Sequence, residues 1–364
     1  MAKVIARAPT NIAVVKYWGK NEKFEDLHIP TKSSLSFTVD SLYTTTSIEA
    51  KNGSGKLDFS LNGKKISGDM PEYEYVGKLM GKLEQIAPEV KKYDYTVVSE
   101  NNFPTAAGYA SSASGFAAFA KAMGGIFEKL EPQVYRRHFA DDKKLSVIAR
   151  LGSGSATRSI PKEGGFVIWH RGISPLEEEE MEGEEVSEKS FAESLVPYTH
   201  WPELRIIYAK VQAEEKKVKS RAGMKETMRT YDKYYEWTEY EEKELAPKLI
   251  EAVKAKDFEA VAQISMECSD NLHAVMEKTQ PPIVYLNEVS RKIIEEVRRM
   301  NSGGAVKCAY TFDAGPNAIV FTLGEFEGET KSMLASIVGA QNIAVARLGP
   351  GAQLVNSEFG KLLR

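Results

Sequence analysis

The segment 101–115, which reads NNFPTAAGYASSASG, has the composition of a loop that holds phosphate. Its small residues let the backbone approach a ligand closely, and the Ala/Gly/Phe-rich stretch after it predicts a helix. The start of such a helix offers unpaired N–H groups and the positive end of its dipole to an anion. Ser111 and Ser112 add hydroxyl groups, which can also bind magnesium. The segment lacks the Walker pattern, and a tight turn that packs a helix on a sheet is the alternative interpretation.

Two further segments place basic side chains beside flexible backbone. Residues 150–159 read RLGSGSATRS, in which glycines free the backbone and serines supply hydroxyl groups. Arg158 can bind a carboxylate or a phosphate through two parallel hydrogen bonds. Residues 16–20, KYWGK, follow the first predicted strand and hold two lysines. These lysines are either solvated surface residues or ammonium groups that point into a phosphate site.

The sequence also contains a third basic cluster, an isolated carboxylate and a helical histidine. Residues 216–221, KKVKSR, precede a predicted helix and form either an anion site or a solvated charge run. Asp313 lies in TFDAGPN, between a predicted strand and a Gly-Pro turn. An Asp at such a place often serves only to form the turn, but among cations its carboxylate can orient or deprotonate a hydroxyl group. We interpret His273, in a helical segment, as a packing or surface residue.

Strands and helices must position these loops. Alternating apolar and β-branched residues predict strands over 2–15, 35–49 and 93–99, and a hairpin around Asn62 and Gly63. Helical spacing of apolar residues predicts helices over 73–87, 110–128 and 143–151. The phosphate-type loop therefore lies between a strand and a helix.

The second half of the chain is predicted to form a separate lobe. The acidic stretch 176–193 has few apolar residues and is predicted to be a solvated loop or linker. We divide the chain into an N-terminal lobe, residues 1–193, and a C-terminal lobe, residues 194–364, whose first strand begins near Leu204 and whose tail packs back on the N-terminal lobe. The C-terminal lobe is predicted to hold helices over 222–255, 257–278 and 282–300 and a strand-turn-strand unit over 307–324. The fold class is α+β, with two helix-backed sheets and a ligand in the cleft between them.

Composition bounds the kind of protein. The chain has 364 residues, of which 42% are hydrophobic and 27% charged, as in ordinary globular proteins. A net charge of −3 gives no general attraction to nucleic acid, so an anionic ligand needs a local cluster of cations. The sequence shows no apolar run of the ~20 residues that a membrane span needs. Two cysteines make neither a disulfide framework nor a metal site. We therefore expect a cytoplasmic protein without a bound metal, a nucleic-acid partner or a membrane partner.

A series of motifs resembles the diphosphomevalonate decarboxylase family, in the same order and over nearly the whole chain. The motifs are APTNIAVVKYWGK, SSLSFT, NNFPTAAGYASSASGFAA, RLGSGSATRS with GGFV, KKVKSRAGM, PPIVYLNE and YTFDAGPNA. That family belongs to the superfamily of galactokinase, homoserine kinase, mevalonate kinase and phosphomevalonate kinase. The resemblance implies a ribosomal-S5-like N-terminal lobe, a ferredoxin-like C-terminal lobe, and loss of CO2 from mevalonate 5-diphosphate with ATP and Mg²⁺. We also expect a phosphorylated mevalonate as the small-molecule partner and a homodimer.

The resemblance also implies roles for individual residues. Asp313 would orient or deprotonate the 3-hydroxyl group, Arg158 would hold the C1 carboxylate, and Lys16 would neutralise charge near the leaving phosphate. The 5-phosphoryl end of the substrate would be bound by Tyr17, Lys20, Ser153, Gly154, Ser155, Ser220 and Arg221. The triphosphate of the nucleotide would be bound by Gly108, Ser111, Ser112 and Ala113.

Three positions depart from the family pattern. Tyr109 stands in place of Leu, Lys32 in place of Asn, and Lys219 in place of Ser. The phenol of Tyr109 could occupy space meant for the nucleotide, and the two lysines could bind one more phosphate of the substrate. These features resemble an ATP-independent mevalonate 3,5-bisphosphate decarboxylase of some archaea, which makes isopentenyl phosphate and needs no cofactor.

The ATP-dependent decarboxylase is the favoured interpretation, because the serines of the SSAS segment are intact. The bisphosphate decarboxylase is the alternative. A kinase that phosphorylates mevalonate and stops there is a second alternative. The combination of Asp313, Arg158 and Lys16 argues against the kinase, since simple phosphorylation does not need all three.

Overall fold

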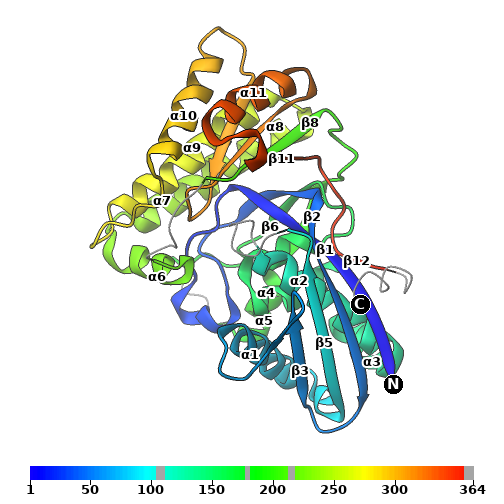
Figure 1. Ribbon diagram of the computed structural model, residues 1–364. Helices are drawn as coiled ribbons and strands as arrows, with labels where there is room; N and C mark the ends of the chain where they lie inside the picture. Colours follow the sequence, from blue (N-terminus) through cyan, green and yellow to red (C-terminus); the bar gives the residue numbers. More distant parts are fainter. Residues whose placement is uncertain (104–110, 177–180, 212–217, 356–364) are drawn as a thin grey trace.

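A sheet of eight strands forms the base of the N-terminal lobe (Figure 1). The computed structural model describes residues 1–103, 111–176, 181–211 and 218–355. Six strands follow one another in the order β12-β1-β2-β5-β3-β4, while β6 pairs with both β2 and β7. The bounds are β1 Ala2–Val15, β2 Ser34–Asn52, β3 Leu57–Leu61, β4 Lys64–Ile66, β5 Tyr93–Asn101, β6 Phe166–Trp169, β7 Ala192–Val196 and β12 Gln353–Leu354. Because β12 pairs with β1, the C-terminal tail returns to the first lobe.

Helices pack on this sheet and enclose the first hydrophobic core. Their bounds are α1 Pro71–Ile86, α2 Ser111–Leu130, α3 Pro132–His138 and α4 Asp142–Gly152. The helix α2 is rich in small buried residues and lies against β1 and β2. A 3₁₀-helix, Gly154–Ser159, follows α4 and packs on α2. The loop between α4 and the 3₁₀-helix is thereby fixed on the sheet rather than left in solvent.

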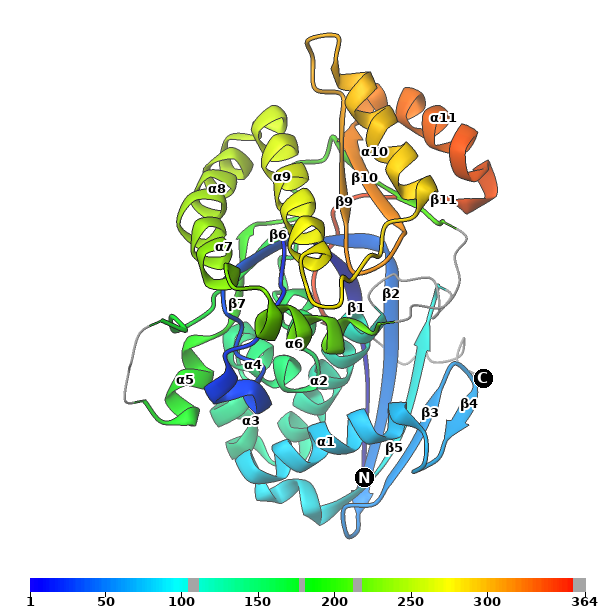
Figure 2. The same cartoon turned by 90° about the vertical axis from the view of Figure 1, so that its left-hand side faces the viewer.

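The C-terminal lobe is built on an antiparallel sheet of four strands in the order β11-β8-β10-β9 (Figure 2). The strands are β8 Leu204–Ala209, β9 Cys308–Phe312, β10 Ala318–Leu323 and β11 Ile343–Ala346. The helices of this lobe include α6 Ser220–Thr230, α7 Tyr234–Tyr240, α8 Ala246–Ala255, α9 Phe258–Glu277, α10 Glu288–Asn301 and α11 Glu327–Val338. Figure 2 shows α9 beside β9, and the two elements are in contact.

The two lobes share a hydrophobic core. Ile12 of β1 and Phe37 of β2 belong to the same buried cluster as Tyr208 of β8 and Phe321 of β10. The rings of Phe37 and Phe321 lie 5.9 Å apart in an edge-to-face arrangement. This shared core holds the end of β1 close to the end of β9. The loops that follow these two strands therefore meet between the lobes.

The predicted strands of the first lobe and its hairpin are confirmed. The turn between β3 and β4 has φ values of 49° at Asn62 and 75° at Gly63. Two successive residues with positive φ are what a two-residue hairpin loop requires, and Asn-Gly adopts them with little strain. The strand from Leu204 and the strand-turn-strand unit of β9 and β10 are confirmed as well.

Two of the predicted long helices differ from the structure. The segment 222–255 is interrupted after Thr230, and a π-helix, Glu241–Leu245, joins α7 to α8. The last predicted helix begins at Glu288 rather than at 282, because the side chain of Asn287 caps it and accepts the N–H of Ser290 at 2.9 Å. The helical spacing of apolar residues continues past Thr230 and begins before Glu288, so this spacing could not indicate where the helices end and begin.

The prediction that 176–193 is a loop is wrong for its second half. The described part contains a short helix, α5 Gly183–Lys189, and the start of β7. Val186 packs with Ile29 and Ile173, and Ala192 packs with Trp169. A few buried apolar contacts thus order a segment whose composition is strongly acidic. No helix of the described residues is long and apolar enough to cross a membrane.

Candidate active site

An ion pair between the two lobes lies at the centre of the candidate active site. Lys16 follows β1 and Asp313 follows β9, and the Lys16 Nζ lies 2.7 Å from Asp313 Oδ1. The lysine is buried, while the side chain of Asp313 is 43% exposed. Burial lowers the pKa of Lys16, and the carboxylate of Asp313 opposes this shift. Asp313 therefore has one oxygen held by a cation, and its side chain is partly accessible to solvent.

Arg158 is a buried cation with neutral partners. Its Nε donates to Asn11 Oδ1 at 3.1 Å and its NH1 donates to Ser34 Oγ at 2.7 Å. Burial lowers the pKa of Arg158 to about 10, while Asp313 acts in the opposite direction. Within the described residues, Arg158 has no carboxylate within the 4.0 Å of an ion pair. A positive charge kept in such surroundings is suited to bind an anionic group of a ligand.

A second group of cations lies at the junction of the loop after β1 with α1 and α6. Burial lowers the pKa of Lys20 to about 8, and Arg221 and Lys82 lower it further by charge repulsion. Arg221 NH2 donates to the carbonyl of Gly152 at 3.4 Å, and its guanidinium lies 4.4 Å from the ring centre of Tyr75. Like charges gather in this way where a polyanion such as a diphosphate binds.

Lys82 and Tyr75 were missed by the reasoning from sequence. They are seven residues apart in the predicted helix 73–87, which places them on one face. This spacing was available in the sequence as a signal. It did not indicate which face of the helix turns toward Arg221, because that depends on how α1 packs against the other lobe.

The loop around Gly154 is shaped by close packing with Tyr17. A Cβ atom on Gly154 would lie 2.8 Å from the Tyr17 hydroxyl oxygen, so only glycine fits there. The Tyr17 ring packs on Trp169 with centroids 4.7 Å apart. Burial raises the pKa of Tyr17, so its hydroxyl keeps its proton and can donate. Ser153 Oγ and Ser155 Oγ lie 3.3 Å apart beside this loop.

Two helix starts carry other predicted site residues. Ser111 and Ser112 form the first turn of the 20-residue helix α2, with Ser112 exposed. Ser220 begins α6, and Lys219 precedes it as an exposed N-terminal cap residue. Ala113 is buried in α2. Gly108 and Tyr109 lie outside the described residues, as do Lys216 and Lys217 of the third basic cluster.

Lys32 does not face a ligand site. Its Nζ lies 2.7 Å from Glu241 Oε2, and it also donates to the backbone carbonyl of Lys16. Both side chains are buried, and Glu241 accepts a further bond of 2.7 Å from Trp237 Nε1. The suggestion from sequence that Lys32 binds an additional phosphate is therefore corrected. The ammonium group of Lys32 instead neutralises the buried carboxylate of Glu241 in the π-helix. It also donates a hydrogen bond to the backbone carbonyl of Lys16, next to the candidate site.

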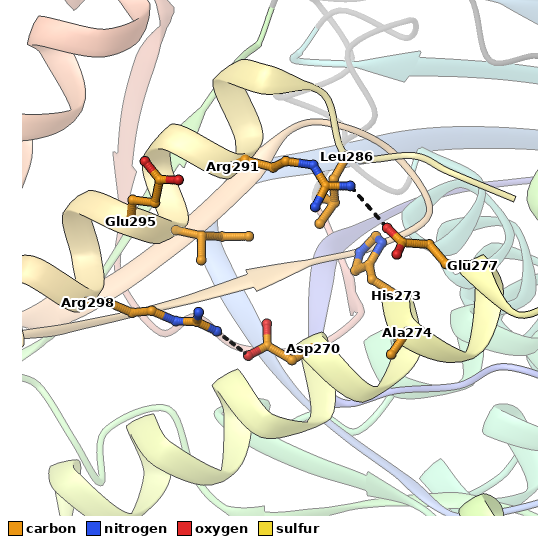
Figure 3. Close-up of a pocket in the computed structure, with 9 residues that line it drawn as sticks. Asp270, His273, Ala274, Glu277, Leu286, Arg291, Glu295 and Arg298 are labelled. Carbon is orange, nitrogen blue, oxygen red and sulfur yellow. Dashed lines mark hydrogen bonds and ion pairs between the residues drawn. The ribbon is translucent and has the colours of Figure 1, made fainter.

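A pocket between α9 and α10 does not contain any of the predicted site residues (Figure 3). Its volume is about 290 Å³, and most of the residues that line it belong to these two helices. Two ion pairs join the helices here, Arg298 with Asp270 at 2.7 Å and Arg291 with Glu277 at 3.1 Å. Both arginines of the pocket are thus paired with carboxylates, in contrast to Arg158. Among the residues that the structure describes, no group of three or more His, Cys, Asp or Glu side chains could hold a metal ion.

The fold and the site define a class of protein. The two lobes and the cleft between them have the fold of the superfamily that includes galactokinase and mevalonate kinase. Residues 8–181 match the diphosphomevalonate decarboxylase-like N-terminal domain, and residues 206–354 match the mevalonate 5-diphosphate decarboxylase C-terminal domain. The chain belongs to the diphosphomevalonate decarboxylase family.

Individual relatives agree over nearly the full length. The diphosphomevalonate decarboxylase of Candida albicans is 37% identical, with 97% of this chain and 98% of the relative covered. The mevalonate diphosphate decarboxylase of Staphylococcus aureus has a TM-score of 0.83 at 32% identity, covering 97% of this chain and 98% of that one. A structure of MDDEF in complex with MVAPP, AMPPCP and magnesium has a TM-score of 0.82 at 34% identity, covering 98% and 100%. These relatives lend no support to an archaeal type of enzyme.

The placement of Lys32 leads to a prediction about stability. Lys32→Met leaves the Glu241 carboxylate buried without its cation, which should cost about 3 to 5 kcal/mol of unfolding free energy. The double variant Lys32→Met/Glu241→Gln removes that charge and should recover most of the loss. As a control, Lys248→Met breaks an exposed pair with Glu244 and should change stability by less than about 0.5 kcal/mol. Urea denaturation measures all three variants. A Lys32→Met protein of normal stability would contradict the assignment.

Proposed function

We propose that this chain is an ATP-dependent diphosphomevalonate decarboxylase, which converts mevalonate 5-diphosphate into isopentenyl diphosphate. The observation that carries the proposal is the pair of Lys16 and Asp313, 2.7 Å apart and partly exposed at Asp313, together with the buried Arg158. The family to which the chain belongs supports the reaction. AMPPCP is an ATP analogue and MVAPP is mevalonate diphosphate, so the complex of the relative MDDEF supports ATP, magnesium and this substrate.

We assign the binding of the substrate to two sets of cations. Arg158 holds the C1 carboxylate, because its planar guanidinium can donate two parallel hydrogen bonds and no carboxylate of the described residues occupies it. The diphosphate is held by the basic group and by neighbouring hydroxyl and backbone groups. These are Lys20, Lys82, Arg221, Tyr17, Ser153, Gly154, Ser155, Lys219 and Ser220.

The nucleotide would be held at the start of α2. Backbone N–H groups of the first turn and the hydroxyl groups of Ser111 and Ser112 suit a triphosphate with its magnesium ion, and Ala113 follows them in the helix. Gly108, which we expect to serve the same site, lies outside the described residues. ATP supplies the phosphoryl group that turns the 3-oxygen into a leaving group.

The residues of the central ion pair carry the two chemical steps. Asp313 takes the proton of the 3-hydroxyl group as that oxygen forms a bond to the γ-phosphorus and the bond to ADP breaks. In the second step the C3–O bond breaks and the phosphate leaves with its electron pair. The electrons of the C1–C2 bond then form the double bond between C2 and C3, and CO2 is released. Lys16 neutralises the charge that gathers on the leaving phosphate.

The remaining expectations are a homodimer and a cytoplasmic location. They rest on the sequence alone and stay predictions, which light scattering and cell fractionation can check. The alternative of an ATP-independent bisphosphate decarboxylase loses one of its two supporting cations, because Lys32 is paired with Glu241. The proposal therefore keeps the ATP-dependent reaction.

Release of CO2 from defined substrates tests the proposed function. The purified protein is given mevalonate 5-diphosphate, 5-phosphate or 3,5-bisphosphate, each with and without ATP and Mg²⁺. We expect CO2 and stoichiometric ADP from the 5-diphosphate with ATP only. CO2 from the 3,5-bisphosphate without ATP would establish the alternative reaction, and ADP without CO2 would establish a kinase.

The role of Asp313 gives a second prediction. Asp313→Asn keeps the shape of the side chain but cannot accept the proton, so turnover should fall by a factor of about 10² or more. The KM for mevalonate 5-diphosphate should change little, because the diphosphate is held by other residues. Asp270→Asn is a matched control, since Asp270 belongs to the same lobe but pairs with Arg298. Coupled measurement of ADP formation gives both constants, and near-normal turnover of Asp313→Asn would contradict the role.

The lowered pKa of Lys20 gives a prediction for the pH dependence. Its ammonium group loses its proton as the pH rises through about 8 in the free protein, and its attraction for a diphosphate is then lost. Accordingly, kcat/KM for mevalonate 5-diphosphate should fall above that pH, while kcat at saturating substrate should fall less. Lys20→Arg keeps a cation at every pH used and should move the fall to higher pH. Lys78→Arg, an exposed site on α1, is the control. An unchanged profile for Lys20→Arg would exclude this group as the cause.

A further inference from the structure

The residue before Asp313 is held by two side chains of α9. Phe312 ends β9, which is the edge strand of the four-stranded sheet and pairs with β10 through Ala318. Backbone groups at the free edge of a sheet have no neighbouring strand to bind. Ser269 of α9 supplies a partner at this point of the edge, and the ring of His273 packs beside it.

The two contacts come from one face of the helix. Ser269 Oγ accepts the N–H of Phe312 at 3.0 Å, and its side chain is buried. The ring of His273 lies edge-on to the Phe312 ring, with centroids 6.2 Å apart. Residues four apart lie above one another on a helix, so both can reach the same residue of the strand.

His273 is uncharged in this position. Burial lowers the pKa of its ring to about 3, and Lys16 lowers it further, while Asp313 acts in the opposite direction. Its Nε2 is buried and has no hydrogen-bond partner in the part of the chain that the structure describes. The ring therefore packs against Phe312 as a neutral aromatic group.

We propose that Ser269 and His273 are positioning residues for Asp313. They fix the backbone of Phe312 and thereby the point from which the Asp313 carboxylate reaches Lys16 and the substrate. On the other side, the Asp313 carbonyl accepts the N–H of Gly315 at 2.7 Å within the tight turn. The inference rests on the proposed function of Asp313 and extends it to two residues that do not touch the substrate.

The helix offers a matched control for a merely structural role. Ser265 lies one turn before Ser269 in α9 and is equally buried, but its hydroxyl has no hydrogen-bond partner among the described residues. Ser265→Ala and Ser269→Ala therefore remove the same group from the same helix, and only the second frees the N–H of Phe312. His273→Leu removes the ring that packs edge-on against Phe312.

Steady-state kinetics with mevalonate 5-diphosphate and ATP tests the proposal. Ser269→Ala and His273→Leu should each lower kcat by about tenfold or more, because small displacements of a reacting group are costly. The KM for mevalonate 5-diphosphate should stay within about twofold. Ser265→Ala should keep the wild-type kcat. In the Asp313→Asn background, Ser269→Ala should have little further effect, since both changes act on one group.

Hydrogen exchange of the Phe312 amide provides a measurement that needs no activity. It should be faster in Ser269→Ala than in Ser265→Ala, and equal rates would overturn the proposal. Equal kcat values for Ser269→Ala and Ser265→Ala would also overturn the proposal. So would a decrease in kcat from Ser269→Ala that is the same in the wild-type and the Asp313→Asn backgrounds. If the wild-type protein releases no CO2 from any phosphorylated mevalonate, the proposed function fails, and the exchange rates still decide whether α9 holds Phe312.

Discussion

The packing of the two lobes on one shared core determines everything that the site can do. Lys16 and Asp313 are almost 300 residues apart in sequence, yet their side chains meet at 2.7 Å. Neither loop contains information about that distance. It results from the buried cluster in which Phe37 of one sheet contacts Phe321 of the other. Protein interiors are close-packed and have low compressibility. The buried cluster therefore fixes the positions of the two sheets relative to each other, and with them the distance between Lys16 and Asp313.

The buried cations of the protein fall into two kinds with different consequences. Lys32 is paired with Glu241 and supported by Trp237, so its charge is compensated inside the protein. Arg158 is equally buried but has only neutral partners among the described residues. A desolvated charge that has no ion-pair partner costs free energy, and an anionic ligand would relieve that cost. This difference is the basis for proposing Arg158, and not Lys32, as a residue that binds the substrate.

Much of the fold could be predicted from the sequence, because local patterns determine local structure. The hairpin at Asn62 and Gly63 follows from the positive φ that this pair tolerates, and the strands follow from alternating side chains. The sequence did not predict that α5 and β7 form regular secondary structure. Their composition is acidic, and the decisive contacts of Val186 and Ala192 are with residues distant in sequence. The π-helix that contains Glu241 could not be predicted for the same reason, because Lys32, which pairs with Glu241, lies in the other lobe.

The candidate site shows where the sequence by itself reached its limit. Motif by motif, the sequence determined the family, the phosphate-type loops and the identities of Asp313, Arg158 and Lys16, because these depend on residue types at fixed short spacings. Only the tertiary structure decided which cations have a counter-ion inside the protein. It paired Lys32 with Glu241, brought Lys82 close to Lys20, and placed Ser269 and His273 against Phe312. The physical reason is that charge compensation and hydrogen bonding depend on distances in space, and these arise when sheets and helices from separate parts of the chain pack together.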